Sequence, residues 1–207
     1  PLYCVDVGIM LQDNIGYAKI NRFAATTYQE MMEKVNSLQQ EGMQKLILDL
    51  RGNPGGYLHI ANQMCDEFLK DGELIVFTEG RNRPKEETFA TRNGQLENIK
   101  VIVLIDEGSA SASEIVSGAL QDNDRGKIIG RRSFGKGLVQ EQIPLQDGSV
   151  IRLTTQRYYT PSGRCIQKEY GESNKDYYME QYLRSDSCKK LTTSSMLINR
   201  FGINIHA

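Results

Sequence analysis

Ser111 is the residue of this sequence whose surroundings best suit nucleophilic chemistry. It lies in the stretch GSASASEI of residues 108–115, which follows a short apolar run. A serine at the start of a helix faces free N–H groups and the positive end of the helix dipole, which favour an alkoxide and an oxyanion. The pattern S-x-x-E that Ser111 forms with Glu114 also predicts an ordinary helix N-cap. The serine by itself therefore leaves both interpretations open.

A reactive serine needs a base, and histidine is scarce in this chain. His59 and His206 are the only two histidines, and His206 is the penultimate residue of a polar tail. A Ser-His-Asp triad would have to use one of them, and a buried, oriented imidazole is not expected at that end of the chain. Lysine is the alternative, because a lysine held among apolar walls loses solvation of its charged form and can then accept a serine proton.

Lys136 is the candidate base, and two familiar motifs that contain it do not fit. Residues 130–137, GRRSFGKG, nearly match the P-loop, but Gly137 replaces the magnesium-binding hydroxyl and a β-like segment follows, so we expect no nucleotide. Ser133 to Lys136 matches S-x-x-K, which requires a helix that the flanking glycines disfavour. The remaining interpretation pairs Lys136 with Ser111 across the fold; the alternative is a solvated surface lysine.

Three apolar neighbours and one glutamine could give Lys136 the environment and the orientation that a general base needs. Phe134, Leu138 and Val139 supply apolar surface, so we expect Lys136 to lie among apolar side chains. Gln140 would orient its amine if the segment bends, because in a flat strand the two side chains would lie about 13 Å apart. The alternative for Gln140 is an ordinary solvated residue.

A second small-residue turn, NPGG at residues 53–56, offers backbone N–H groups that no side chain shields. The amides of Gly55 and Gly56 could form an oxyanion hole with the amide of Ala112. The alternative is a tight connection that needs positive φ at glycine. We expect Asp49 and Arg51, just before this turn, to form a structural ion pair.

Hydrophobic periodicity predicts the elements that hold these turns. Residues 27–38 and the stretches after both turns have helical spacing, and residues 27–30 have the form of a capping box. The predicted strands are residues 3–11, 15–20, 46–50, 101–105, 127–130, 139–145 and 150–159.

The order of these elements predicts an α/β fold. Strand, small-residue turn and helix occur twice in succession, which is typical of βαβ units and a largely parallel sheet. Residues 139–145 and 150–159 add an antiparallel hairpin. Active sites gather at the carboxyl ends of parallel strands, where both turns lie.

Composition narrows the class of protein. The chain has 207 residues, 39% hydrophobic content and a formal net charge of -1, which fit one globular domain and give no basic field for nucleic acid. No apolar stretch approaches a membrane span, and the first residues do not resemble a signal segment. Four scattered cysteines form no C-x-x-C pair, so we expect no structural zinc, and their pairing stays open.

Five stretches in order give a resemblance to the C-terminal processing peptidases, also called tail-specific proteases. They are IGYAKINRF at 15–23, DLRGNPGG at 49–56, GSASASEI at 108–115, SFGKG at 133–137 with Gln140, and YYTPSGR at 158–164. The resemblance implies an α/β core of the crotonase and Clp-protease kind. It also implies Ser111 as nucleophile, Lys136 as base, Gln140 as the residue that orients the lysine, and oxyanion donors from Ala112 and the Gly55-Gly56 turn.

The resemblance further implies a bacterial serine endopeptidase that cleaves unfolded or C-terminally tagged polypeptides through an acyl-enzyme. No metal or cofactor is required. The expected partner is a polypeptide with an apolar C-terminus, a homo-oligomer stays open, and the expected location is periplasmic or otherwise extracytoplasmic.

Two departures from the family pattern limit this interpretation. The PDZ domain that usually precedes such a core is absent from this chain, and residues 185–207 look unlike the family, so we expect a core of residues 1–184 and a polar tail. Two rivals remain: a catalytically silent peptide-binding or scaffold domain, and an acyl-CoA-binding enzyme that uses the glycine turns without Ser111 or Lys136.

Overall fold

The computed structural model describes residues 3–91, 93–170 and 177–179. The chain divides into two compact units, Pro1–Glu169 and Tyr170–Ala207, and all elements named below belong to the first. Of the second unit only Tyr170 and the helical residues 177–179 are described. The predicted boundary between residues 1–184 and 185–207 lies outside the described residues.

A five-stranded sheet contains the predicted parallel strands. Its order is β1-β2-β3-β6-β7, and every pair except the antiparallel β1–β2 is parallel. The strands are β1 (Val5–Leu11), β2 (Ile15–Ile20), β3 (Lys45–Asp49), β6 (Lys100–Ile105) and β7 (Gly126–Gly130). The predicted βαβ arrangement is therefore confirmed, and the carboxyl ends of β3 and β6 lie side by side.

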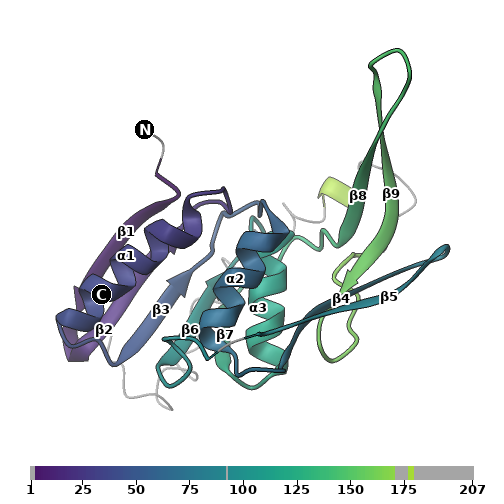
Figure 1. The fold of residues 1–207 in the computed structure, drawn as a ribbon. Helices are drawn as coiled ribbons and strands as arrows, with labels where there is room; N and C mark the ends of the chain where they lie inside the picture. The colour runs from purple at the N-terminus through teal and green to yellow at the C-terminus, as the bar shows by residue number, and fades with distance from the viewer. Residues whose placement is uncertain (1–2, 92, 171–176, 180–207) are drawn as a thin grey trace. The chain divides into compact units, whose positions relative to one another are not determined.

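Three helices cover one face of this sheet: α1 (Thr27–Gln40), α2 (Leu58–Phe68) and α3 (Ala112–Asp122). The parallel strands follow one another in a single direction across the sheet, so right-handed crossovers place all three helices on the same side. Figure 1 shows them in front of the sheet, and α3 contacts β7 of this sheet and β4 of a second one.

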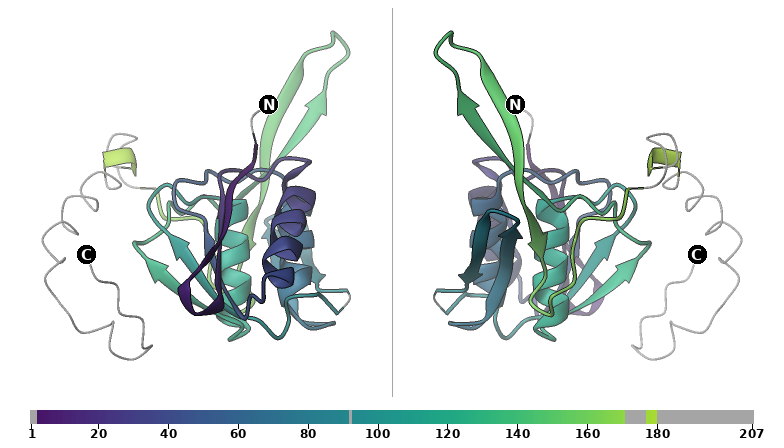
Figure 2. Two further views of the ribbon diagram at one scale, coloured as in Figure 1. Left: turned by 90° about the vertical axis from the view of Figure 1, so that its left-hand side faces the viewer. Right: turned by 90° about the vertical axis from the view of Figure 1, so that its right-hand side faces the viewer.

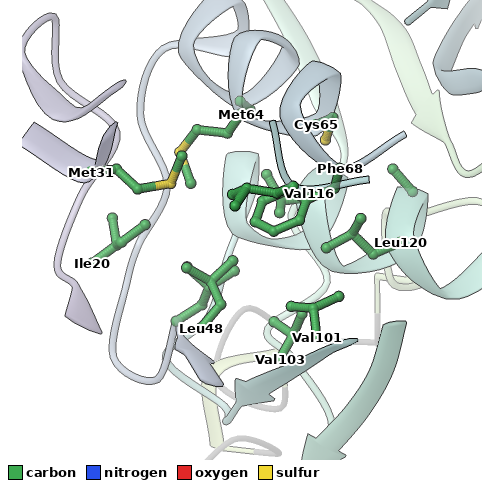
Figure 3. Packing of buried hydrophobic residues seen from close by; sticks show 14 of the residues in the cluster. Ile20, Met31, Leu48, Met64, Cys65, Phe68, Val101, Val103, Val116 and Leu120 are labelled. Atoms are coloured by element: carbon green, nitrogen blue, oxygen red, sulfur yellow. The ribbon is translucent and has the colours of Figure 1, made fainter. Parts of the chain in front are cut away.

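The hydrophobic core lies between these helices and the sheet (Figure 3). Leu48 of β3 and Val103 of β6 are fully buried, and Phe68 of α2 and Val116 of α3 close over them. The buried strand centres explain why β3 and β6 are continuous apolar runs rather than alternating ones. This packing fixes where both strands end, and therefore where the two turns begin.

A four-stranded antiparallel sheet has the order β5-β4-β9-β8. It consists of β4 (Leu74–Gly80), β5 (Arg83–Phe89), β8 (Leu138–Pro144) and β9 (Val150–Tyr159). The predicted hairpin of β8 and β9 is confirmed and extends beyond the other strands, as Figures 1 and 2 show. The pair β4–β5 was not predicted, because β5 carries mostly exposed polar residues without an apolar alternation.

The start of α1 corrects one expectation. The predicted capping box of Thr27 and Glu30 does not form, since Thr26 is the N-cap and makes no side-chain capping bond. The Thr27 hydroxyl instead accepts a hydrogen bond from Ala24 N at 2.8 Å, and the Glu30 carboxylate accepts one from Val5 N at 3.0 Å. Glu30 thus ties α1 to β1, a contact between distant residues that the local motif does not reveal.

No helix among the described residues has the length and apolar character needed to span a bilayer.

Candidate active site

The two small-residue turns meet at one edge of the five-stranded sheet, as predicted. Leu50 N donates to Leu104 O at 2.9 Å, which continues the pairing with β6 one residue beyond the end of β3. Ala110 N and Ser113 Oγ then donate to the carbonyl oxygen of Asn53, at 2.9 and 3.0 Å. We call residues 106–111, which join β6 to α3 and end at Ser111, the serine turn. The NPGG turn and the serine turn therefore form one hydrogen-bonded unit.

Buried side chains inside this unit hold its shape. Asn53 is fully buried; its Nδ2 donates to Ile20 O at 2.9 Å and its Oδ1 accepts from Gly55 N at 2.9 Å. Ser109 is also fully buried, and its Oγ donates to Leu50 O at 2.8 Å and accepts from Asp106 N at 3.0 Å. Satisfied buried polar groups of this kind make a single arrangement of the backbone favourable.

Gly55 lies directly against the serine turn. A β-carbon at this position would come within 2.8 Å of Ser111 Cβ, 2.9 Å of Ala112 N and 2.6 Å of Ala110 O. Gly55 also has a φ of 97°, which favours glycine. The positive φ that the structural alternative required is present, and so is the close approach to Ser111 that a reactive site requires.

Ser111 has an unusual backbone at the start of α3. It is the N-cap residue, and its N–H donates to Glu114 Oε2 at 2.8 Å, so the predicted capping box with Glu114 is confirmed. Its φ of 56° and ψ of -113° are rare for a non-glycine residue, whereas an ordinary N-cap is extended. A serine on a strained strand-to-helix turn has the geometry of a nucleophile elbow.

Two backbone amides near Ser111 are available as oxyanion donors. Within the described part of the chain, neither Ala112 N nor Gly56 N donates to a protein acceptor. Gly55 N does, because Asn53 Oδ1 accepts from it. Of the three donors that the resemblance implies, the structure thus leaves Ala112 and Gly56 free to donate and assigns Gly55 to the shape of the turn.

Gly56 is held in place by the segment that follows β2. Phe23 N donates to Gly55 O at 3.0 Å and Tyr57 N donates to Phe23 O at 2.8 Å, one on each side of Gly56. A β-carbon on Gly56 would come within 2.0 Å of Phe23 O. The absence of a side chain is therefore a packing requirement at this position as well as at Gly55.

The predicted ion pair of Asp49 and Arg51 is confirmed. Arg51 Nη2 lies 2.6 Å from Asp49 Oδ2, and the hydroxyl of Tyr17 donates to the same oxygen at 2.6 Å. Burial raises the pKa of Asp49, but the hydrogen bonds from Arg51 and Tyr17 and the charge of Lys19 outweigh it and lower the pKa to about 2. The pair braces the end of β3, next to the NPGG turn.

Lys136 lies in the segment of residues 131–137, which joins β7 to β8 without regular secondary structure. We call this segment the lysine loop. Phe134 N donates to Ser109 O at 2.9 Å, and Lys136 N donates to Glu114 Oε2 at 2.8 Å. Ser111 N donates to that same oxygen, so the backbones of Ser111 and Lys136 are brought together, no more than two hydrogen-bond lengths apart.

The side chain of Lys136 does not lie where the sequence suggested. It is exposed, so the expectation that apolar walls enclose it is wrong for this conformation. The physical reason is that its apolar neighbours in sequence do not enclose the side chain: Phe134, Leu138 and Val139 are themselves only half-buried. Within the residues that the structure describes, no hydrogen bond joins Lys136 Nζ to Ser111 Oγ.

Gln140 lies on β8, where the pairing with β9 shifts register between Val139 and Gln140. Such a bulge bends a strand, which is the condition on which its predicted role depended. Its side chain is nevertheless exposed, and among the described residues no hydrogen bond links it to Lys136. The structure therefore does not bring Gln140 into contact with the lysine amine.

Glu114 is the residue of this site whose part the sequence did not reveal. Its carboxylate is buried and accepts hydrogen bonds both from the serine turn and from the lysine loop. The S-x-x-E pattern signals the first contact, but no local pattern could signal the second, since the lysine loop begins beyond α3 and β7.

Among the described residues no group of three or more His, Cys, Asp or Glu side chains could hold a metal ion. His59 lies outside the hydrogen-bonded unit, with its ring stacked on exposed Tyr57 at 5.4 Å. The arrangement offers a serine, a lysine and backbone amides, which are groups for acyl transfer.

Comparison with known proteins agrees with this chemistry. Residues 14–177 match the model of peptidase family S41. The carboxy-terminal-processing protease of Bartonella bacilliformis is 46% identical over 162 residues, which are 76% of this chain and 37% of that protein. CtpB, a carboxy-terminal processing protease of Bacillus subtilis, is 36% identical over 75% of this chain and 32% of that protein.

A solved structure supports the same assignment. The photosystem II D1 C-terminal processing protease superposes with a TM-score of 0.70 and 31% identity, covering 76% of this chain and 42% of that one. This chain thus spans about a third of the length of these curated relatives.

Proposed function

The chain belongs to peptidase family S41, and we propose that it is the catalytic core of a serine-type endopeptidase with Ser111 as nucleophile and Lys136 as general base. The observation that carries this proposal is the strained backbone of Ser111 at the N-terminus of α3, beside the free amide of Ala112. An N-cap serine needs neither a left-handed φ nor a glycine pressed against its β-carbon.

The proposed reaction is acyl transfer. Ser111 Oγ attacks a peptide carbonyl carbon while its proton passes to the neutral amine of Lys136, and the amides of Ala112 and Gly56 stabilise the oxyanion. The protonated amine then gives its proton to the leaving nitrogen, which leaves an ester on Ser111. Water activated by the same amine hydrolyses this ester and restores the serine.

Because Lys136 is exposed in the chain alone, the proposal includes a change when substrate binds. A polypeptide lying along the serine turn would cover the lysine and exclude water, which favours its neutral form. We propose unfolded or C-terminally tagged polypeptides as substrates, because the matched family is a peptidase family and the relatives are named carboxy-terminal-processing proteases. We also propose an extracytoplasmic location, which rests on the family resemblance of the sequence alone.

The test is cleavage of an unfolded casein-type substrate by the wild type, Ser111→Ala and Lys136→Ala. We expect no cleavage by Ser111→Ala and a rate lower by on the order of 10²–10⁴-fold for Lys136→Ala. Ser37→Ala in α1 and Lys127→Ala in β7, both exposed, are the matched controls and should cleave like the wild type.

Equal cleavage by wild type, Ser111→Ala and Lys136→Ala would overturn the proposal. A serine-reactive fluorophosphonate, followed by intact mass, separates the remaining cases. Labelling of Ser111 without cleavage indicates a competent site that lacks substrate delivery. Absence of both labelling and cleavage indicates the catalytically silent peptide-binding domain.

A further inference from the structure

Glu114 is a buried carboxylate with no cationic partner among the described residues. It is the third residue of α3 and only 6% exposed. Burial raises its pKa, while hydrogen bonds from the Ser133 side chain and from the backbones of Lys136, Ser111 and Gly135 act in the opposite direction. A buried carboxylate is costly unless hydrogen bonds satisfy it, so the groups around Glu114 explain its presence.

The hydrogen-bond donors around Glu114 come from both the serine turn and the lysine loop. Oε2 accepts from Ser111 N and from Lys136 N, each at 2.8 Å, and Oε1 accepts from Gly135 N at 2.7 Å. Capping α3 needs only the bond from Ser111. The other two bonds are surplus to the cap, and both go to the lysine loop.

From these contacts we infer that Glu114 is a positioning residue, which holds the lysine loop against the serine turn so that Lys136 can serve Ser111. This inference rests on the proposed function. Glu114 acts through the backbone and does not touch the reacting atoms. It fixes where the chain carries the lysine, while the side chain of Lys136 remains free to turn.

The contacts require a carboxylate and not an amide. Three N–H groups point at two oxygens, and hydrogen bonds to an ionised acceptor are roughly twice as strong as neutral ones. Glutamine has one oxygen and one NH₂ group. In either orientation its NH₂ would face at least one backbone N–H of the lysine loop, so the loop would lose at least one of its two bonds to this residue.

Glu67 provides a matched control. It is also a helical glutamate, 2% exposed, and its two oxygens accept from the hydroxyl of Tyr28 at 2.5 Å and from Gln95 N at 2.9 Å. None of these groups belongs to the serine turn or the lysine loop. Glu67→Gln therefore reproduces the loss of a buried carboxylate without disturbing the candidate site.

The experiment compares wild type, Glu114→Gln and Glu67→Gln. The rate of Ser111 labelling by a fluorophosphonate reports the reactivity of the serine without substrate delivery, and thermal unfolding reports stability. We expect Ser111 to be labelled at least about tenfold more slowly in Glu114→Gln than in the wild type. This corresponds to an increase of about 1.4 kcal/mol in the activation free energy of labelling. Glu67→Gln should label within about twofold of the wild type, although its unfolding midpoint falls.

Amide hydrogen exchange supplies a readout that does not depend on reactivity. In Glu114→Gln the amides of Gly135 and Lys136 should exchange faster, while those of β3 and β6 keep their protection. If Glu114→Gln does not fold, Glu114→Asp replaces it. It keeps the negative charge at the start of α3 but is one methylene too short to reach both segments.

Each outcome decides something. Wild-type labelling by Glu114→Gln would overturn the positioning role alone, and so would an equal slowing in Glu67→Gln, which would mark a general effect of lost stability. A wild type that does not label at Ser111 would overturn the proposed function, and the positioning role with it.

Discussion

The serine turn and the lysine loop are held in place in different ways. The serine turn lies where β3 and β6 end, and buried side chains such as Asn53 and Ser109 bind it to the neighbouring backbone. The lysine loop has no regular structure, and hydrogen bonds from its backbone amides and an ion pair of Arg131 with Glu107 hold it. Ser111 is half-buried at the rim of the core, whereas Lys136 is exposed.

This difference indicates that the packed sheet fixes Ser111, the proposed nucleophile, whereas contacts at the surface of the core place Lys136, the proposed base. Buried hydrogen bonds within a packed sheet open only with large parts of the structure, while exposed loops open locally at little cost. Substitutions in the serine turn should therefore change stability and reactivity together. Substitutions of exposed side chains in the lysine loop, such as Lys136, should change reactivity alone.

Gly55→Ala should have the largest effect, because its β-carbon would meet the backbone and side chain of the serine turn and φ is 97°. We expect a loss of at least about 3 kcal/mol in the free energy of unfolding and a rate lower by on the order of 10²-fold or more. Chemical denaturation and fluorophosphonate labelling measure the two effects.

Gly52→Ala is the control for this change. Gly52 also has a left-handed φ, of 71°, but a β-carbon there would meet no atom within 4 Å. We expect it to cost about 1 kcal/mol, the cost of the backbone conformation alone. Equal effects of the two substitutions would contradict the close contact between Gly55 and Ser111.

Asp49→Asn should have an intermediate effect and should remove a pH dependence. Because the pKa of Asp49 is lowered to about 2, its ionised form stabilises the fold fully above its unfolded value of 3.8 and less as the pH falls toward 2. We expect the substitution to cost about 2 kcal/mol at neutral pH. Urea denaturation should show that between about pH 5 and about pH 3 the wild type loses roughly 1 kcal/mol more than the variant.

Glu141→Gln tests whether the loss of stability expected for Asp49→Asn is specific to a carboxylate beside the serine turn. Glu141 of β8 pairs with Arg83 at 2.9 Å, and the side chains of Arg83 and Glu141 are 51% and 37% exposed. Surface pairs of this kind contribute about 0–1 kcal/mol, so we expect a loss smaller than that of Asp49→Asn. A loss as large as that of Asp49→Asn would contradict the distinction between the two regions.

Lys136→Ala should have the smallest effect on stability. Its side chain is exposed, so we expect a change within about 0.5 kcal/mol in the free energy of unfolding, although activity is lost. Ser109→Ala in the serine turn removes a fully buried hydroxyl with two backbone partners and should cost about 1–2 kcal/mol. Thermal unfolding of both variants checks this ranking, and a larger loss in Lys136→Ala would contradict it.

The fold was largely predictable because its buried strands and helices have recognisable apolar patterns in the sequence. The runs that form β3 and β6 are mostly apolar, and the parallel pairing that they predict puts both turns at one edge of the sheet. Strand β5 was not predictable, because its exposed residues carry charge and it forms through pairing with β4. The capping box predicted at Thr27 failed for a similar reason: Glu30 bonds to β1 instead.

For the candidate site, the sequence predicts which segments come together but not all of the contacts that their side chains make. The pairing of Asp49 with Arg51 is local and follows from their spacing. The exposure of Lys136 is not local, since it depends on which elements cover the loop, and apolar neighbours in sequence do not determine that. The contacts of Glu114 with the lysine loop likewise join two segments that the chain separates by α3 and β7.

The position of the lysine loop along the chain separates the two proposed catalytic residues into different layers of assembly. The segment that ends at Gly130 already contains all five strands of the first sheet, helix α3 and Ser111, but not Lys136. Lys136, the proposed base, lies beyond it on the connection to β8. The first sheet and its helices can therefore hold the proposed nucleophile in place before the segment that carries the proposed base folds back against the serine turn.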